Sequence, residues 1–231
     1  MKFAIIAAGE GSRLIKEGVN TPKPLIPLQG TPIIERLVVL FASQGASCIN
    51  IIINEQQPDT LQLLKRLQEQ YPINIVVKDT QSSMHSLYAL SHLLRGERFC
   101  LTTVDTIFKE EEFAEYIKAF KSDSSDALMA VTEYIDDEKP LYVETDSKLA
   151  ITAFSDTPTA SSKYISGGIY GLQENALDIL EQCINGGIER MRNFQRSLVA
   201  NGLNLKAYPF KKIIDIDHAE DISKAEEFLT E

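Results

Sequence analysis

The sequence predicts an α/β fold with a mostly parallel sheet, helices on both faces of that sheet, and extra antiparallel strands in the second half of the chain. Two observations carry the prediction. Short apolar runs alternate with segments of helical periodicity over residues 1–125, and those apolar runs are continuous rather than alternating. A strand that is apolar on both sides is buried on both faces, which is typical of a parallel sheet between two layers of helices.

In the first half of the chain, strands and helices are expected in strict alternation. The helix expected at 59–70 places Leu61, Leu64 and Leu67 on one face, and the segment 32–44 has helical spacing that stops before Gly45. Strands are expected at 3–8, 48–53, 73–77 and 99–104, and helices at 32–44, 59–70, 83–94 and 110–121. Connections of this kind join neighbouring parallel strands.

The second half of the chain has a different rhythm, because strand-like runs follow one another there without long helices between them. We expect strands at 127–132, 141–144, 149–154 and 164–172, added as antiparallel strands around the edge of the sheet. Helices at 174–183 and 189–201, strands near 203–208 and 213–216, and a helix from about 219 complete the order. No internal repeat or linker interrupts the pattern, so a single domain over residues 1–231 is predicted.

The composition argues against several classes of partner. The 231 residues include 23 Lys and Arg against 33 Asp and Glu, a net charge of −10, whereas proteins that bind nucleic acid usually present a basic surface. No apolar stretch approaches the roughly 20 residues of a membrane span. The odd, scattered Cys48, Cys100 and Cys183 suggest reduced thiols. We therefore expect a cytoplasmic protein with no nucleic-acid or membrane partner; a particular oligomeric state is not indicated.

The first strand runs directly into a glycine-rich segment, A-A-G-E-G-S-R-L at residues 7–14. In open α/β sheets, ligands bind beyond the carboxyl ends of the strands. Glycines at such a position let backbone amides approach phosphate oxygens. The segment lacks the third glycine of the dinucleotide fingerprint and the Gly-Lys-Ser/Thr ending of a Walker loop.

A second short motif, P-K-P-L at residues 22–25, follows about ten residues later. Prolines on both sides of Lys23 restrict the backbone and remove backbone donors. Such a segment can hold one ammonium group in a fixed place.

Together the two motifs resemble those of the nucleotidyltransferases that make nucleotide-activated sugars and alcohols. The shared pattern is A-A-G-x-G-x-R-L, about ten residues, then P-K-P-L-x-P-x-x-G-x-P-I. The resemblance implies a Rossmann-like fold with a nucleotide-binding half over residues 1–125 and an acceptor-binding half over 126–231. It also implies Mg²⁺-dependent transfer of NMP from an NTP to a phosphorylated acceptor, first of all a sugar 1-phosphate, with release of pyrophosphate.

The resemblance also implies site residues. Asp105, after the apolar run 99–104, and Asp215, in I-I-D-I-D, match the family's metal ligands, with Asp217 as the expected helper of Asp215. S-G-G-I-Y at 166–170 resembles the family's acceptor-lining N-x-G-I-Y. Arg13 and Lys23 are the expected catalytic cations. The expected nucleotide-binding residues are Ala7, Ala8, Gly9, Gly11, Ser12, Arg13, Lys23, Ser82 and Ser86, and the expected acceptor-binding residues are Asp156, Lys163, Gly167 and Gly168.

One departure bears on the acceptor. Many sugar-specific members carry F-x-E-K-P, whose lysine holds the acceptor phosphate, but this chain has Thr157 at that position in F-S-D-T-P, residues 154–158. A CDP-alcohol-forming cytidylyltransferase is one alternative. A molybdenum-cofactor guanylyltransferase-like enzyme, which shares the A-A-G and P-K-P-L elements, is another. The alternative that is not an enzyme is a regulatory domain that binds nucleotide sugars without catalysis.

Overall fold

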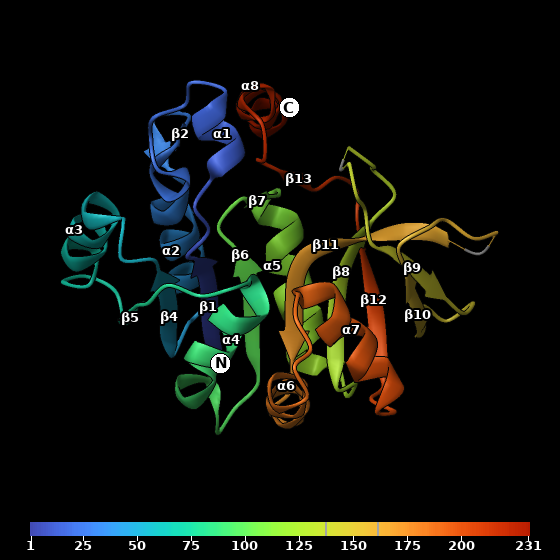
Figure 1. The fold of residues 1–231 in the computed structure, drawn as a ribbon. Helices are drawn as coiled ribbons and strands as arrows, with labels where there is room; N and C mark the ends of the chain where they lie inside the picture. The colour runs from blue at the N-terminus through green and yellow to red at the C-terminus, as the bar shows by residue number, and fades with distance from the viewer. Residues whose placement is uncertain (137, 161) are drawn as a thin grey trace.

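The computed structural model describes residues 1–136, 138–160 and 162–231 (Figure 1). Across these residues nine strands form one sheet, and two short strand pairs lie outside it. The sheet strands are β1 (Lys2–Ala7), β4 (Cys48–Ile53), β5 (Ile73–Val77), β6 (Phe99–Thr103), β8 (Ala127–Thr132), β9 (Tyr142–Thr145), β10 (Ile151–Ser155), β11 (Ser162–Leu172) and β12 (Leu205–Phe210). The short strands are β2 (Pro27–Leu28), β3 (Thr31–Pro32), β7 (Thr106–Ile107) and β13 (Ile214–Asp215).

The helices connect these strands much as the periodicity indicated. They are α1 (Ser12–Lys16), the 3₁₀ helix η1 (Lys23–Leu25), α2 (Ile33–Ser43), α3 (Pro58–Leu67), α4 (Ser83–Leu94), α5 (Glu110–Ser122), α6 (Asn175–Asn185), α7 (Met191–Ala200) and α8 (Ala219–Thr230). The α/β prediction is confirmed. The strands β5, β4, β1 and β6 lie side by side and parallel, so the carboxyl ends of β1 and β6 meet at one edge.

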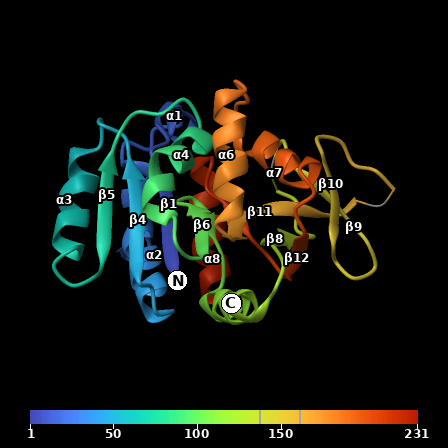
Figure 2. The same cartoon turned by 90° about the horizontal axis from the view of Figure 1, so that it is seen from below.

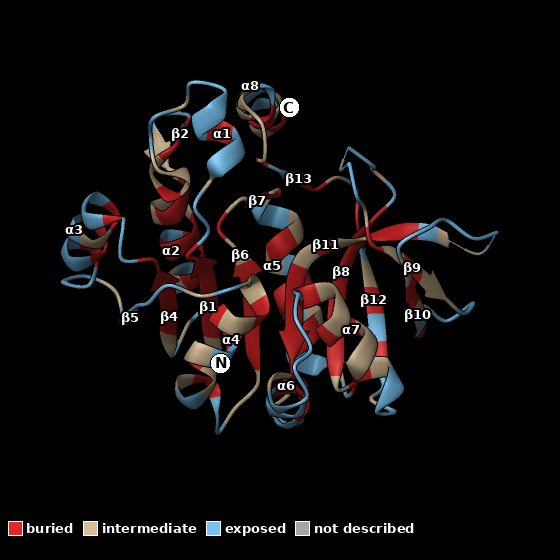
Figure 3. Ribbon diagram, viewed as in Figure 1, coloured by how far each residue is buried: buried red, intermediate tan, exposed pale blue. Residues whose placement is uncertain are grey.

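Helices cover both faces of the sheet, as the continuous apolar strands required (Figure 2). Phe3 and Ile5 of β1 pack with α2, α3, α5 and α8 on one face, whereas Ala4 and Ile6 pack with α4, α6 and α7 on the other. Successive side chains of a strand point to opposite faces, so the two faces of β1 belong to different hydrophobic cores. The red interior of Figure 3 shows that the central strands β1, β4 and β6 are buried over most of their length.

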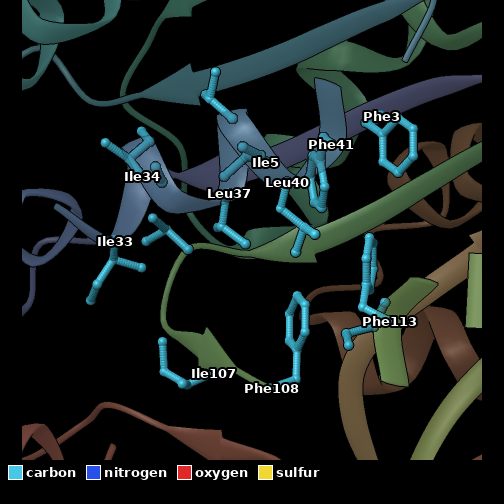
Figure 4. Close-up of a cluster of buried hydrophobic side chains, with 14 of the residues drawn as sticks. Phe3, Ile5, Ile33, Ile34, Leu37, Leu40, Phe41, Ile107, Phe108 and Phe113 are labelled. Atoms are coloured by element: carbon cyan, nitrogen blue, oxygen red, sulfur yellow. The ribbon is translucent and has the colours of Figure 1, made fainter. Parts of the chain in front are cut away.

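Aromatic side chains organise the core on the α2–α5 face (Figure 4). Phe41 stacks between Phe3 and Phe113, with ring centroids 4.5 and 5.4 Å apart, and Phe108 stacks on Phe113 at 4.9 Å. Phe108 directly follows β7, so this stack ties the segment after β6 to the central strand. Stacked aromatic pairs contribute about 0.5–1.5 kcal/mol each beyond the area that they bury.

The second half of the chain differs in part from the prediction. The strand β11 is antiparallel to β6, β8 and β9, and β10 is antiparallel to β9, as expected of added strands. However, β8 lies between β11 and β12 rather than at an edge, and β12 is parallel to β8. The chain returns to β12 through α6 and α7, and a helical crossover allows a parallel pair.

Two further findings concern the chain as a whole. Among the described residues, no helix combines the length and the apolar character needed to cross a membrane. The described cysteines are all free, with Cys100 and Cys183 buried and Cys48 partly buried, and burial raises the pKa of the Cys100 thiol.

The packing of β11 against α5 gives the first prediction. A Cβ atom added at Gly171 would lie 2.8 Å from Cδ2 of the buried Phe120 ring, so we expect Gly171→Ala to lower the free energy of unfolding by about 1–3 kcal/mol. Chemical denaturation measures the change. Gly9→Ala serves as the control, because a Cβ there meets no atom within 4 Å. Equal stability of both variants would show that Phe120 yields easily.

Candidate active site

The glycine-rich segment lies at the carboxyl end of β1, and buried amide side chains hold its shape. Asn54 Nδ2 donates to the carbonyl oxygen of Ala8 at 3.1 Å, and Gln57 Nε2 donates to those of Ala7 and Gly9 at 3.3 Å. Gly11 has a φ of 64°, a left-handed conformation that glycine adopts without strain, and α1 begins immediately after it. These hydrogen bonds therefore hold the loop from its buried side, and its other side faces a pocket.

The free side of this loop borders a pocket of about 480 Å³, which we call the loop pocket. Thr80 and Ser86 close its far wall through a hydroxyl–hydroxyl hydrogen bond of 2.6 Å. The residues that line it are Ile6, Ala8, Gly9, Glu10, Gly11, Ser12, Lys23, Thr80, Gln81, Ser82, Ser83, Ser86, Thr103, Val104 and Asp105.

Seven of the residues expected to bind the nucleotide line the loop pocket, and two do not. Ala8, Gly9, Gly11, Ser12, Lys23, Ser82 and Ser86 are the seven. Ala7 is the last residue of β1 and is 1% exposed, so its side chain belongs to the core. Arg13 lies one residue beyond the pocket's edge and lines a second pocket instead.

Lys23 is the centre of the charged groups beside the loop pocket. Its Nζ atom lies 2.8 Å from Oδ2 of Asp105 and 3.1 Å from Oδ1 of Asp217. The Lys23 side chain is only 11% exposed, and a Cβ atom added at Gly11 would lie 3.7 Å from Lys23 Cβ. Burial alone would lower the pKa of Lys23, but the charges of Asp105 and Asp217 outweigh it and raise the pKa. The ammonium group therefore stays charged.

The two carboxylates beside Lys23 are both stabilised in their charged form by neighbouring cations. Burial would raise the pKa of Asp105, yet the Lys23 ammonium and hydrogen bonds hold it below the ordinary value. Asp217 uses its second oxygen to bind Nη1 of Arg13 at 2.8 Å. One carboxylate thus joins the two cations that the sequence singles out as catalytic. We call Arg13, Lys23, Asp105 and Asp217 the charged cluster.

A hydrogen bond between distant parts of the backbone brings Asp217 to this place. The N–H of Ile216 donates to the carbonyl oxygen of Asp105 at 3.1 Å, and β13 pairs with β7 so that Asp215 lies opposite Thr106. Figure 1 shows β13 running beside β7 above the sheet, next to the start of α8. Asp215 is exposed at this point, whereas Asp217 is turned toward Lys23.

Capping interactions fix the same corner from the C-terminal side. Asp221 accepts from the N–H groups of His218 at 2.7 Å and of Asp217 at 3.1 Å. Glu17, which follows α1, accepts from the N–H of Ala219 at 2.7 Å and contacts His218 Nδ1 at 2.6 Å. The contact with Glu17 raises the pKa of His218 and lowers that of Glu17. Carboxylates at the start of α8 also suit the positive end of the helix dipole.

Beyond Asp217 lies a second pocket of about 490 Å³, which we call the outer pocket. Arg13 and Asp217 stand at the border between the two pockets, and Gly167 of β11 contributes backbone to its wall. The residues that line it are Arg13, Glu17, Thr132, Tyr134, Asp136, Glu138, Ile165, Ser166, Gly167, Ile213, Asp215, Asp217, His218, Ala219, Glu220, Asp221 and Lys224.

The predicted metal ligands are only partly assembled. Asp105 and Asp217 share the Lys23 ammonium, and Asp215 lines the outer pocket. Within residues 1–136, 138–160 and 162–231, no three His, Cys, Asp or Glu side chains are grouped to hold a metal ion. A pair of carboxylates is nevertheless the donor set that Mg²⁺ uses when substrate phosphates supply its other ligands.

The four residues expected to bind the acceptor fall into two groups. Gly167 lines the outer pocket, and its neighbour Gly168 has a φ of 74° with Thr106 Oγ1 2.7 Å from where a Cβ would be. Asp156 instead pairs with Arg192 and Arg196 at 2.5 and 2.7 Å, beside α7. Lys163 pairs with Glu133 at 3.0 Å and is 61% exposed. Asp156 and Lys163 do not line the outer pocket, because their own ion pairs hold them elsewhere, and Gly168 does not line it either.

Sequence reasoning missed four residues that build the site: Asn54, Gln57, Glu17 and Asp221. Asn54 directly follows β4 and Gln57 immediately precedes α3. Polar residues after a buried strand that neighbours the glycine-rich loop could have indicated both. Asp221 follows His218 at the spacing of a capping box, a recognisable signal for the start of a helix. Nothing in the sequence places Glu17 near residue 219.

Comparisons with known proteins identify the family. Residues 2–231 match the model of a family described as nucleotidyl transferase. A choline-phosphate cytidylyltransferase of Streptococcus pneumoniae is 26% identical over 99% of this chain and 98% of its own length. A mannose-1-phosphate guanyltransferase of Schizosaccharomyces pombe is 27% identical over 78% of this chain, and the match covers 52% of that protein. The chain thus spans nearly all of one relative and about half of others.

Solved structures show the same fold. A Bacillus anthracis protein assigned as a glucose-1-phosphate thymidylyltransferase superimposes with a TM-score of 0.86 at 20% identity, covering 99% of this chain and 94% of that one. The inositol-1-phosphate CTP transferase of T. maritima gives a TM-score of 0.78 at 17% identity, covering 99% and 97%.

Proposed function

This chain belongs to the nucleotidyl transferase family, and from that premise we propose that it transfers the nucleotidyl group of an NTP to a phosphorylated acceptor and releases pyrophosphate. The proposal rests above all on one observation. The charged cluster stands between the loop pocket and the outer pocket, with Lys23 and Asp105 lining the first and Arg13 and Asp217 lining the second. Two substrates, one in each pocket, would therefore meet beside Arg13 and Lys23.

The loop pocket is assigned to the triphosphate. Backbone amides of Gly9, Gly11 and Ser12 line it, and glycine at positions 9 and 11 leaves room for phosphate oxygens. Thr80, Gln81 and Ser82 form the wall beside α4, where they offer polar groups to the base and ribose. The outer pocket then receives the acceptor, with its phosphate directed toward Arg13 and Lys23.

The reaction is an in-line displacement at the α-phosphorus. An anionic oxygen of the acceptor phosphate forms the new P–O bond, while the bond to the bridging oxygen breaks and pyrophosphate leaves with the electron pair. No general base is needed, because a phosphate monoester is already anionic near neutral pH. Lys23 neutralises charge beside the α-phosphate, and Arg13, which lines the outer pocket, presents a planar fork to the acceptor phosphate. Positioning and charge neutralisation therefore dominate the catalysis.

The donor set is compatible with the Mg²⁺ that the family resemblance implies. Oxygens of Asp105 and Asp217 already share one cation, the Lys23 ammonium, so they enclose a place where positive charge is stabilised. These two residues would hold the ion, with Asp215 as a neighbour on β13. When bound, a divalent ion supplies neutralisation of phosphate charge at the reaction centre. Lys23 and Arg13 supply the remainder from the protein side.

The test of this proposal is a screen for pyrophosphate release. Each of four NTPs is combined with a panel of sugar 1-phosphates and alcohol phosphates. Release that requires both a nucleotide and a particular acceptor supports nucleotidyl transfer. Binding of nucleotide sugars without pyrophosphate release for any pair would favour the non-catalytic regulatory alternative.

Removing the ammonium at position 23 should separate turnover from folding. We expect Lys23→Ala to lower kcat/KM by about 10²–10³-fold, the usual effect of losing one charge-stabilising group at a reacting centre. Stability should fall too, because Asp105 and Asp217 lose the cation that they share, so turnover is compared under conditions in which the variant remains folded. Steady-state kinetics and denaturation measure both quantities, and the exposed Lys16, which lines neither pocket, gives the control Lys16→Ala. Wild-type turnover in Lys23→Ala would sink the assignment.

Metal dependence should reveal which aspartates work together. We expect chelator to abolish turnover, Mg²⁺ or Mn²⁺ to restore it, and Asp105→Asn to eliminate it in a folded protein. Asp217→Asn should be more damaging than Asp215→Asn, because Asp217 and not the exposed Asp215 is bonded to Lys23 beside Asp105. Full activity in the presence of chelator, or the reverse order of the two variants, would contradict this arrangement.

The position of Thr157 leads to a prediction about sugars. No lysine stands there, and the adjacent Asp156 is engaged by Arg192 and Arg196. We therefore expect weak activity with glucose 1-phosphate and mannose 1-phosphate, with kcat/KM well below the roughly 10⁴ M⁻¹s⁻¹ at which ordinary enzymes begin. Efficient use of either sugar phosphate would show that the departure at position 157 has no consequence.

A further inference from the structure

The outer pocket is unusually acidic for a site that receives a phosphate. Seven carboxylate residues are among those that line it, against two residues with permanent positive charge, Arg13 and Lys224. The seven are Glu17, Asp136, Glu138, Asp215, Asp217, Glu220 and Asp221. A phosphomonoester that carries no other charge would bring two further negative charges into these surroundings.

The charges are not spread evenly through the pocket. At the border with the loop pocket, Asp217 is neutralised by Arg13 and Lys23. Farther along, Lys224 alone serves three carboxylates, with Nζ 3.1 Å from Asp136, 3.0 Å from Glu220 and 3.3 Å from Asp221. The positive charge that can hold a phosphate lies at the border, and the excess of negative charge lies beyond it.

The wall beside this acidic part suits an organic cation. Tyr134, Ile165 and Ile213 contribute apolar and aromatic surface to the lining. The Tyr134 ring already accepts one cation, since Lys212 Nζ lies 4.8 Å from its centroid. An aromatic face with carboxylates nearby is the usual environment for ammonium groups.

One buried polar atom at this corner has no hydrogen-bond partner among the described residues. His218 lines the outer pocket, and the unpartnered atom is its buried Nε2. The carboxylate nearest to it, Glu138 Oε1, is 3.6 Å away, which exceeds hydrogen-bonding distance. Buried polar atoms are normally satisfied, so a ligand or water that reaches the pocket completes this one.

These observations rest on the proposed nucleotidyl transfer, and with them we propose that the acceptor is a small phosphomonoester that also carries a positively charged amine. Its phosphate lies at the border beside Arg13 and Lys23, and its ammonium lies beyond, among Asp136, Glu138 and Glu220. The bonds made and broken are those of the displacement described above, and the amine takes no part. It selects the substrate by charge, because a neutral acceptor gains nothing from the carboxylates.

Matched pairs of acceptors test the charge directly. Phosphocholine is compared with 3,3-dimethylbutyl phosphate, its neutral isostere, and glucosamine 1-phosphate with glucose 1-phosphate. We expect kcat/KM for the better cationic acceptor to exceed that of its neutral partner at least 10-fold, with the preference shrinking as salt is added. Equal values within both pairs would overturn the inference.

Two variants locate the selectivity in the outer pocket. Glu138 is 63% exposed, so Glu138→Gln should leave the fold intact and reduce the cation preference about 3-fold or more. Lys224→Met removes the positive charge that serves three carboxylates and should increase the preference. The KM for NTP should stay unchanged in both, and Glu69→Gln, on an exposed residue that lines neither pocket, is the matched control. A preference that neither variant changes rules out this location.

Binding measurements separate this inference from the proposed function. Isothermal titration calorimetry compares phosphocholine with its neutral isostere on the full chain. Pyrophosphate release without any cation preference contradicts the inference alone. Preferential binding of phosphocholine without pyrophosphate release from any of the four NTPs contradicts nucleotidyl transfer and leaves the cation site in place.

Discussion

The arrangement of the whole site depends on one buried ammonium group. Lys23 comes from a proline-flanked turn, Asp105 from the end of β6 and Asp217 from the segment before α8, and the three meet within 3.1 Å of one nitrogen. Without the cation, two carboxylates would face each other in partly buried surroundings, which is unfavourable. Without the carboxylates, burial of the ammonium would be equally costly. Each charged group therefore stabilises the others in their partly buried positions.

This mutual dependence explains features of the fold that hydrophobic packing alone does not require. Three features serve mainly to bring Asp217 to Lys23: the short pair of β7 and β13, the hydrogen bond from Ile216 to Asp105, and the two hydrogen bonds that Asp221 Oδ2 accepts from the N–H groups of Asp217 and His218. Glu17 then joins the end of α1 to the start of α8. Segments about 200 positions apart in the sequence thus close around one corner of the sheet.

The sequence predicts the regular part of this structure well and the irregular part poorly, for a physical reason. Strands such as β4 and β5 and the helix α4 follow from local periodicity, and they match the expected bounds residue for residue. The parallel pairing of β12 with β8 depends on tertiary packing, and so does the choice of Asp217 over Asp215 as the partner of Lys23. Strand alternation predicts a shared direction for Asp215 and Asp217, but β13 ends at Asp215.

The two halves of the site differ in how they treat charge, and this difference links the departure at Thr157 to the outer pocket. The loop pocket keeps the glycines, the lysine and the aspartate expected of a triphosphate site. On the acceptor side, position 157 lacks a cation, Arg192 and Arg196 are committed to Asp156, and carboxylates surround the remaining space. An acceptor held there by phosphate alone would meet repulsion along most of its length. Recognition must therefore come from another part of the acceptor molecule, and the charge of the walls determines which part that is.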